Sequence, residues 1–347
     1  MVRIVFVPLL TLCVLGATWT GKVDKVYELS QLNLHDEGVH LFDGGLYTGS
    51  ARGQNIFEFD EDDLDESTPA VVDTSGEDHE AGNQITLGLC SSSSKDRIYA
   101  AFASFDGSEQ GGIGYWKKGD LKWGEGLTVN NQAIVNDCVV KGDYVYFTGS
   151  SAGPSVMVAD LDLDAESYKE IYNGSLLAPT SQFGANGLVY MDDFLLVSHT
   201  DTGRIVKVPV KDDEADGDAT TVSIVDSSNI LKGGDGLIRV NDDVIIVVTA
   251  KYITLLETSD DWVSAEIKKT VDVSAIDAGG ASTAALKSDD EKEVEIYVAF
   301  PGWVAFNAGT NQQNFKLALV KFSDEDIDDL SDDWAATLIA AVMLWMA

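Results

Sequence analysis

Basic residues are scarce in this sequence. Its 347 residues contain 23 Lys and Arg against 58 Asp and Glu, which gives a formal net charge of −35. A chain this negative repels nucleic-acid phosphates and anionic membrane surfaces, so we expect neither as a partner. Two interpretations of the acidity remain open: solubility, for example in a salty medium, or a negative field that concentrates cations.

The sequence also lacks long apolar runs. Short apolar runs occur at its two ends. Residues 1–18 contain Arg3, a short apolar run and then small residues, which is typical of a secretory signal peptide; a buried first strand is the alternative. Residues 326–347 are predicted to form a C-terminal tail, either a short amphipathic helix or a frayed end. Neither run is long enough to span a bilayer, so we expect a secreted protein with no membrane span.

Cysteine is rare. The chain has three cysteines, and removal of the signal peptide would leave Cys90 and Cys138. A secreted protein can form a disulfide between them, but two buried free thiols are an equal alternative. The sequence alone does not decide between the two.

Helical periodicity is scarce as well. Apolar, β-branched runs instead flank short turns of Gly, Asn and Asp, which is the pattern of β-hairpins. The pattern occurs in residues 41–48, 138–148, 186–199 and 237–249, and more weakly in residues 89–101 and 284–299. A third strand-like run follows each hairpin. The chain is therefore predicted to be all-β.

The hairpins recur with a period near fifty residues. Their first strands are predicted to begin at Glu37, Thr86, Asn136, Asn186, Asp235 and Ser282, in steps of 49, 50, 50, 49 and 47 residues. Six four-stranded units at this period predict one domain, a six-bladed β-propeller over residues 22–325. The sixth unit runs out of strand after Phe322, so Lys25-Val-Tyr-Glu-Leu29 is expected to complete it, because no blade can bury both faces alone.

Polar residues recur at the predicted strand starts. In a propeller the first strand of each blade lines the central channel, so residues at its start crowd the channel mouth. Four starts carry a carboxylate or amide side chain, and we call them the axial quartet: Glu37, Asn136, Asn186 and Asp235. Carboxylate and amide oxygens without histidine or thiolate suit a hard divalent cation, calcium best, rather than zinc or copper. Each start alone is a common turn signal, but four in phase favour a metal site.

The quartet and its neighbours resemble a known family. The order Glu37-Gly38, Asn136-Asp137, Asn186-Gly187 and Asp235-Gly236 is similar to that of the senescence marker protein and gluconolactonase family. The wider group includes the calcium-dependent paraoxonases and diisopropyl fluorophosphatase. Residues 183–188 and 202–207 carry the local likeness, within a pattern that covers residues 26–322. The resemblance implies that the quartet holds a catalytic divalent ion at which lactones, esters or phosphotriesters are hydrolysed.

The sequence departs from this family beside the quartet. Paraoxonase-like members place a histidine at the head of the second blade, where Ile85-Thr-Leu87 stands here. Sugar-lactonase members place an arginine just before the third-blade asparagine, where Ile134-Val135 stands here. The residues that select the substrate are therefore not shared, and the resemblance predicts a metal-binding propeller without a particular substrate.

These features predict a secreted, monomeric hydrolase of a small ester or lactone. The expected ion would polarise a carbonyl or phosphoryl oxygen and acidify bound water, and Asp235 is predicted to act as base or nucleophile. The alternative is a propeller that binds a ligand or a protein around a structural calcium ion, since propellers carry many unrelated functions. A strictosidine-synthase-like former of carbon–nitrogen bonds agrees less well, because those proteins generally lack the quartet.

Overall fold

The computed structural model describes most of the chain. The described residues are 18–30, 36–50, 55–64, 70–72, 84–104, 107–117, 123–151, 153, 155–163, 168–225, 229–290, 293–304 and 314–325. Almost all of the predicted signal peptide and the whole of the predicted tail, residues 326–347, lie outside these ranges.

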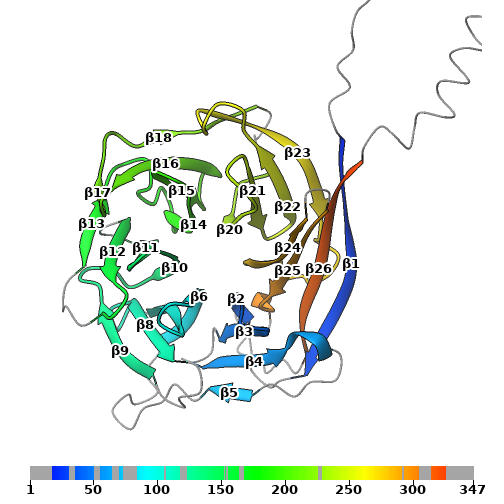
Figure 1. The fold of residues 1–347 in the computed structure, drawn as a ribbon, viewed down its shortest axis with the longest axis horizontal. Helices are drawn as coiled ribbons and strands as arrows, with labels where there is room; N and C mark the ends of the chain where they lie inside the picture. Colours follow the sequence, from blue (N-terminus) through cyan, green and yellow to red (C-terminus); the bar gives the residue numbers. More distant parts are fainter. Residues whose placement is uncertain are drawn as a thin grey trace, which may run out of the picture.

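The strands form six sheets arranged in a ring, with one edge of each sheet facing the centre (Figure 1). Blade 1 contains β2 (Asp36–Phe42), β3 (Gly45–Ser50), β4 (Ile56–Asp60) and β5 (Ala70–Val72). Blade 2 contains β6 (Gln84–Ser92), β7 (Arg97–Ser104), β8 (Gly112–Lys117) and β9 (Trp123–Thr128), and blade 3 contains β10 (Val135–Lys141), β11 (Tyr144–Gly149), β12 (Val156–Asp160) and β13 (Lys169–Tyr172). A short 3-10 helix (Glu61–Asp63) follows β4.

The second half of the ring follows the same order from the centre outward. Blade 4 contains β14 (Ala185–Tyr190), β15 (Phe194–His199), β16 (Arg204–Lys211) and β17 (Glu214–Ala215), with β18 (Thr220–Thr221) also paired to β16. Blade 5 contains β20 (Gly234–Arg239), β21 (Val244–Thr249), β22 (Tyr252–Glu257), β23 (Ser264–Asp272) and β19 (Ser223–Ile224). Blade 6 contains β24 (Ala284–Asp290), β25 (Glu293–Phe300), β26 (Asn314–Glu325) and β1 (Thr18–Ser30). The predicted six-bladed propeller is confirmed.

The first strand of the chain closes the ring. β1 pairs antiparallel with β26 from Thr18 opposite Glu325 to Ser30 opposite Asn314. The predicted closing strand is therefore present, and it is longer than residues 25–29. Its residue Leu29 is 2% exposed and joins a core cluster that also contains side chains of blades 1 and 6.

The second strands of the blades are buried on both faces. β15 and β21 are buried along their whole length, because each blade packs against a neighbouring blade on either side. Their sequences, Phe-Leu-Leu-Val-Ser-His and Val-Ile-Ile-Val-Val-Thr, are continuous apolar runs that end in polar residues. A sheet that faces solvent on one side would show alternating polar residues instead.

A disulfide joins the inner strands of two neighbouring blades. Cys90 of β6 and Cys138 of β10 are bonded, with their Cα atoms 5.7 Å apart. The structure therefore selects the disulfide from the two alternatives that the sequence left open.

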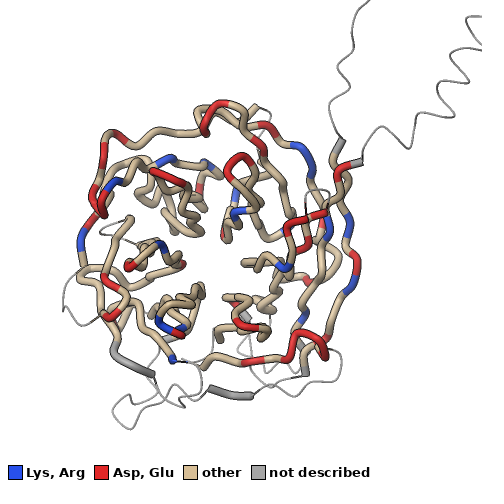
Figure 2. Tube along the Cα trace, viewed as in Figure 1, with Lys and Arg blue, Asp and Glu red and all other residues tan. Residues whose placement is uncertain are grey.

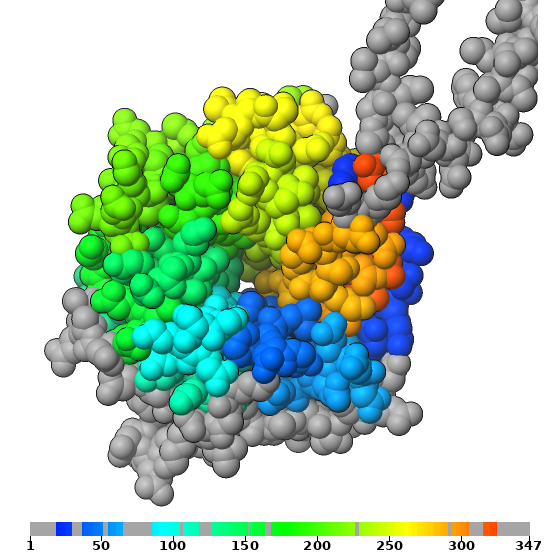
Figure 3. Space-filling model, in the orientation of Figure 1, coloured from blue at the N-terminus to red at the C-terminus, as the bar shows by residue number. Residues whose placement is uncertain are grey.

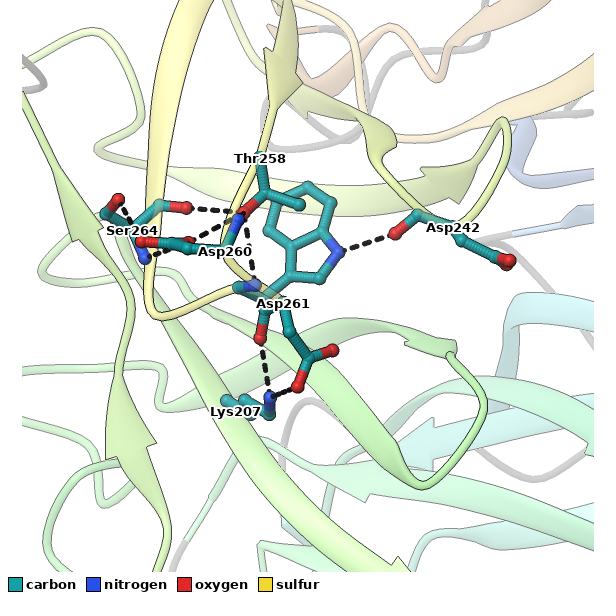
Figure 4. Close-up of polar contacts among 7 residues, drawn as sticks. Lys207, Asp242, Thr258, Asp260, Asp261 and Ser264 are labelled. Carbon is teal, nitrogen blue, oxygen red and sulfur yellow. Dashed lines mark hydrogen bonds and ion pairs between the residues drawn. The ribbon is translucent and has the colours of Figure 1, made fainter.

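The segment between blades 4 and 5 is divided between the two sheets. Within residues 219–225, β18 pairs with β16 of blade 4, whereas β19 pairs in parallel with β23 of blade 5. Lys207 of β16 adds a second connection, because its Nζ donates to the carbonyl oxygen of Asp261 at 2.6 Å and to Oδ2 at 2.8 Å (Figure 4). The neighbouring Trp262 is 1% exposed and donates from Nε1 to the carbonyl of Asp242 at 2.8 Å.

Acidic residues occur in every part of the ring rather than in one patch (Figure 2). This distribution fits the interpretation of the charge as a solvated surface. Within the described ranges, none of the helical segments has the length and apolar character needed to cross a membrane.

The closure by β1 predicts a difference between two substitutions in that strand. Leu29→Ala removes a buried side chain and should lower the free energy of unfolding by about 2–5 kcal/mol. Val26→Ala, at a position 40% exposed, is the matched control and should cost less than about 1 kcal/mol. Urea denaturation measures both. Equal, small effects would show that β1 is not part of the core.

Candidate functional site

Five of the six inner strands contain a β-bulge at the same level of the ring. In each, two residues stand opposite one residue of the second strand, as between Asp36 and Val39 of β2 or between Ala185 and Leu188 of β14. The first bulge residues are Glu37, Leu87, Asn136, Asn186 and Asp235. Because a bulge re-aims the side chains that it carries, the whole axial quartet occupies one structural position around the channel.

The space-filling view shows a narrow opening at the centre of the ring (Figure 3). The quartet differs in its access to solvent: Glu37 and Asn186 are buried, whereas Asn136 and Asp235 are partly exposed. Solvent therefore reaches two of the four side chains.

The second residue of the bulge is glycine in blades 1, 2, 4 and 5. A Cβ atom at Gly187 would lie 2.2 Å from the carbonyl oxygen of Asp235, and one at Gly38 would lie 2.0 Å from that of Leu87. The glycines are required because the backbone of the next blade approaches this closely. This approach brings the quartet residues of neighbouring blades together.

Hydroxyl groups orient the two asparagines of the quartet. Nδ2 of Asn136 donates to Oγ of Ser150 at 3.1 Å, and Nδ2 of Asn186 donates to Oγ1 of Thr200 at 3.0 Å. Each hydroxyl in turn donates to the carbonyl just before the bulge of the next blade, at 2.5 and 3.0 Å. Because these bonds use the amide nitrogens, Oδ1 is the atom of each asparagine that remains for a ligand of the channel.

The backbone carbonyls of three quartet residues are also held in place. They accept hydrogen bonds from hydroxyl groups of neighbouring blades: Ser282 to Glu37 at 2.9 Å, Thr148 to Asn186 at 2.6 Å and Ser198 to Asp235 at 3.1 Å. These bonds fix the bulges from behind. The side chains therefore project from a backbone that cannot easily shift.

Blade 3 departs from the glycine rule and places Asp137 at the second bulge position. Its Oδ1 accepts a hydrogen bond from the backbone of Cys138 at 2.8 Å, and its Oδ2 accepts one from Leu188 of the next blade at 3.3 Å. Burial raises the pKa of Asp137, and these two hydrogen bonds oppose the shift. Sequence reasoning did not assign this residue a role, although it stood next to Asn136.

Two carboxyl groups share this site. Burial raises the pKa of Asp235, the negative charge of Asp137 raises it further, and a hydrogen bond from Asn186 opposes both effects. Two neighbouring carboxylates repel each other when both are ionised, and a proton or a cation relieves this repulsion. A divalent cation would supply that charge.

The donor set fits an oxygen-preferring ion. The quartet offers two carboxylates and two oriented amide oxygens, a set of oxygen donors that suits calcium. Across the described part of the chain, no group of three or more His, Cys, Asp or Glu side chains is arranged as a metal site, so the amides are essential to this assignment.

The structure corrects the predicted starts of two blades. Thr86 is paired normally with Phe102, and Leu87 occupies the bulge position of blade 2. In blade 6 the irregularity lies between Leu286 and Ser288, several residues beyond Ser282. Only four of the six blades therefore contribute a quartet residue, and the equivalent residue of blade 2, Leu87, is apolar.

Other groups that could take part in chemistry have structural contacts. Residues 149–153, Gly-Ser-Ser-Ala-Gly, match the motif of a serine nucleophile, but they connect two strands, and Oγ of Ser151 donates to Oε1 of Gln132 at 2.6 Å. A nucleophile elbow requires a strand-to-helix turn. His199 is buried, with Nε2 2.9 Å from the carbonyl of Ala178, and burial lowers the pKa of His40 to about 4.

Asp201 holds the loop that leads into β14. Its carboxylate accepts backbone hydrogen bonds from four successive residues: Thr180 at 2.9 Å, Ser181 at 2.6 Å, Gln182 at 3.1 Å and Phe183 at 3.3 Å. Burial alone would raise the pKa of Asp201, but the hydrogen bonds from Ser181, Phe183 and Gln182 outweigh it and hold the pKa well below its usual range. The anchored loop ends three residues before Asn186.

No protein-family model matches this sequence, and no curated protein matches it either. Solved structures share its fold. The allergen Mala s 1 of Malassezia sympodialis is 14% identical with a TM-score of 0.64, covering 86% of this chain and 96% of its own.

Two further structures with this fold have functions in their descriptions. The PQQ-bound aldose sugar dehydrogenase of Streptomyces coelicolor is 12% identical with a TM-score of 0.57, covering 88% of this chain and 99% of its own. Regucalcin of Agrobacterium tumefaciens, described as a calcium-binding protein, is 13% identical with a TM-score of 0.54, covering 88% of this chain and 96% of its own. At these identities the likeness shows the propeller fold and not membership of one family.

The loop anchor predicts a pH-dependent loss of stability in Asp201→Asn. Because the pKa of Asp201 is lower in the folded than in the unfolded state, its stabilisation is present above the unfolded pKa of about 4 and is lost as the pH falls below it. The variant should lose about 1–2 kcal/mol at neutral pH, a figure that allows for partial exposure.

Thermal unfolding from pH 7 to pH 3 measures this effect, and the difference from the wild type should shrink as the pH falls. Asp193→Asn, in an exposed turn of the same blade, is the matched control and should be nearly neutral. A difference that stays constant with pH would exclude the ionised anchor.

Proposed function

We propose that this protein is a secreted, calcium-dependent hydrolase of small esters or lactones. The observation that carries the proposal is the arrangement of Glu37, Asn136, Asn186 and Asp235 at one bulge position of four inner strands. The bulges, the neighbouring glycines and the hydroxyl groups behind the asparagines give these oxygens fixed positions. Residues that served only to form turns would not need these supporting contacts.

The quartet would hold the ion, and a bound calcium ion would polarise the carbonyl oxygen of a substrate and lower the pKa of a water molecule. Asn136 and Asn186 would contribute Oδ1, because their nitrogens already bind hydroxyl groups. Glu37 is buried and would serve as a ligand rather than contact the substrate. Asp137 would balance the charge of the ion from blade 3.

Asp235 is the best candidate for the reacting carboxylate. It is partly exposed, whereas Glu37 is buried, and Asn186 hydrogen-bonds to it. In this position it would accept the proton of the attacking water, or attack the carbonyl carbon itself.

Calcium dependence predicts reversible loss of activity. A chelator should abolish hydrolysis of simple aryl esters and lactones by the purified mature chain, and added calcium should restore it. Asp235→Asn should lower kcat/KM by about a hundredfold or more, because it removes the base. Asp193→Asn, an exposed acid in blade 4, is the matched control and should keep full activity.

Calorimetry of calcium binding separates this proposal from the alternative. If calcium binds and the full substrate panel is untouched, the propeller is a binding protein with a structural ion. If hydrolysis persists after chelation, or if Asp235→Asn remains active, the proposed mechanism is wrong.

A further inference from the structure

An apolar cluster lies beside the axial quartet. Its buried members are Ile85, Leu87, Ala103 and Ile134, and the partly buried Phe183 and Trp303 pack against them with Ala133. We call this cluster the apolar wall. It is separate from the larger core clusters between blades, and it occupies the level of the ring where the bulges lie.

Three members of the wall lie at or near the bulge positions of the inner strands. Leu87 occupies in blade 2 the bulge position that quartet residues occupy in four other blades. Ile134 stands two residues before Asn136, and Phe183 stands three residues before Asn186. The wall therefore continues the ring of quartet side chains with apolar groups.

Trp303 reaches the wall from another part of the ring. It follows β25 of blade 6, whereas the buried members of the wall belong to blade 2 and to the start of blade 3. Blade 6 does not adjoin either of them, so Trp303 packs against residues of blades that are not its neighbours in the ring. Gly279 approaches its backbone closely, because a Cβ atom at Gly279 would lie 2.6 Å from the nitrogen of Trp303.

The two aromatic residues of the wall remain partly exposed. Phe183 ends the loop that Asp201 anchors through four backbone hydrogen bonds, so its position is also fixed. Partly exposed aromatic residues near polar residues are typical of ligand pockets, where apolar walls surround a few polar groups.

We infer that the apolar wall binds an alkyl or aryl group of the substrate, so that the enzyme selects hydrophobic esters or lactones over sugar lactones. This inference rests on the proposed function and specifies its substrate class. A polyhydroxylated substrate would leave hydroxyl groups without partners against the two partly exposed aromatic rings, which the buried Leu87 and Ile134 support from behind. An alkyl chain would displace water from the same surface.

A comparison of substrates with and without an alkyl chain tests the inference on the wild-type protein first. The rate of hydrolysis is measured in calcium buffer for γ-decalactone, γ-butyrolactone and glucono-δ-lactone. The wild type should prefer γ-decalactone to each of the others by about tenfold or more in kcat/KM. Trp303→Ala should reduce this preference, with little effect on γ-butyrolactone, whereas Val304→Ala, at a position 59% exposed, is the matched control.

A binding measurement separates the wall from the proposed chemistry. The lactam 5-hexylpyrrolidin-2-one keeps the ring and the alkyl chain but resists hydrolysis, and pyrrolidin-2-one lacks the chain. Calorimetry should show about tenfold or more tighter binding of the hexyl compound to the wild type and to Val304→Ala, but not to Trp303→Ala.

Each outcome decides one of the two proposals. Selective binding of the hexyl lactam without hydrolysis of any lactone would support the wall and overturn the hydrolase. Hydrolysis with equal rates for the long and short lactones, or preference for glucono-δ-lactone, would support the hydrolase and overturn the wall. If Trp303→Ala does not fold, the wild-type comparison of the two lactams still decides the inference.

Discussion

The antiparallel pairing of β1 with β26 is the interaction on which the rest of the structure depends. Each blade is buried on both faces and has no stable solvent-facing side, so a ring with a missing strand would expose one side of blade 6. The closure is contributed by the two ends of the propeller, Thr18–Ser30 and Asn314–Glu325. Only in a closed ring do six inner strands share one axis, and only then do residues about fifty positions apart become neighbours.

The site follows from this geometry through a repeated local device. A bulge turns one side chain of five inner strands, a glycine beside it admits the next blade in four of them, and hydroxyl groups behind three of these bulges hold the backbone. Blade 3 replaces the glycine by Asp137 and blade 2 replaces the polar residue by Leu87. These two substitutions make the ring unequal at this level: Asp137 adds a negative charge in blade 3, and Leu87 places an apolar residue at the bulge of the adjacent blade 2.

Much of this could be predicted from the sequence, because turn residues and β-branched runs act locally and their period survives in the chain. The fold, the closing strand and the common register of Glu37, Asn136, Asn186 and Asp235 are of this kind. Contacts between distant residues were not predictable in the same way. Leu87 rather than Thr86 occupies the bulge position because of a one-residue bulge in β6. The role of Asp137 depends on its burial, and the position of Trp303 depends on the path of a loop. The Cys90–Cys138 disulfide depends on which inner strands are adjacent.

The central claim is that one divalent ion binds on the axis of the ring. The most direct test is a crystal structure of the mature protein soaked with a lanthanide that replaces calcium, with the ion located by its anomalous signal. We predict one strong peak within about 2.3–2.6 Å of oxygen atoms from Glu37, Asn136, Asn186 and Asp235. Full occupancy at another site with no peak between these four side chains would contradict the account.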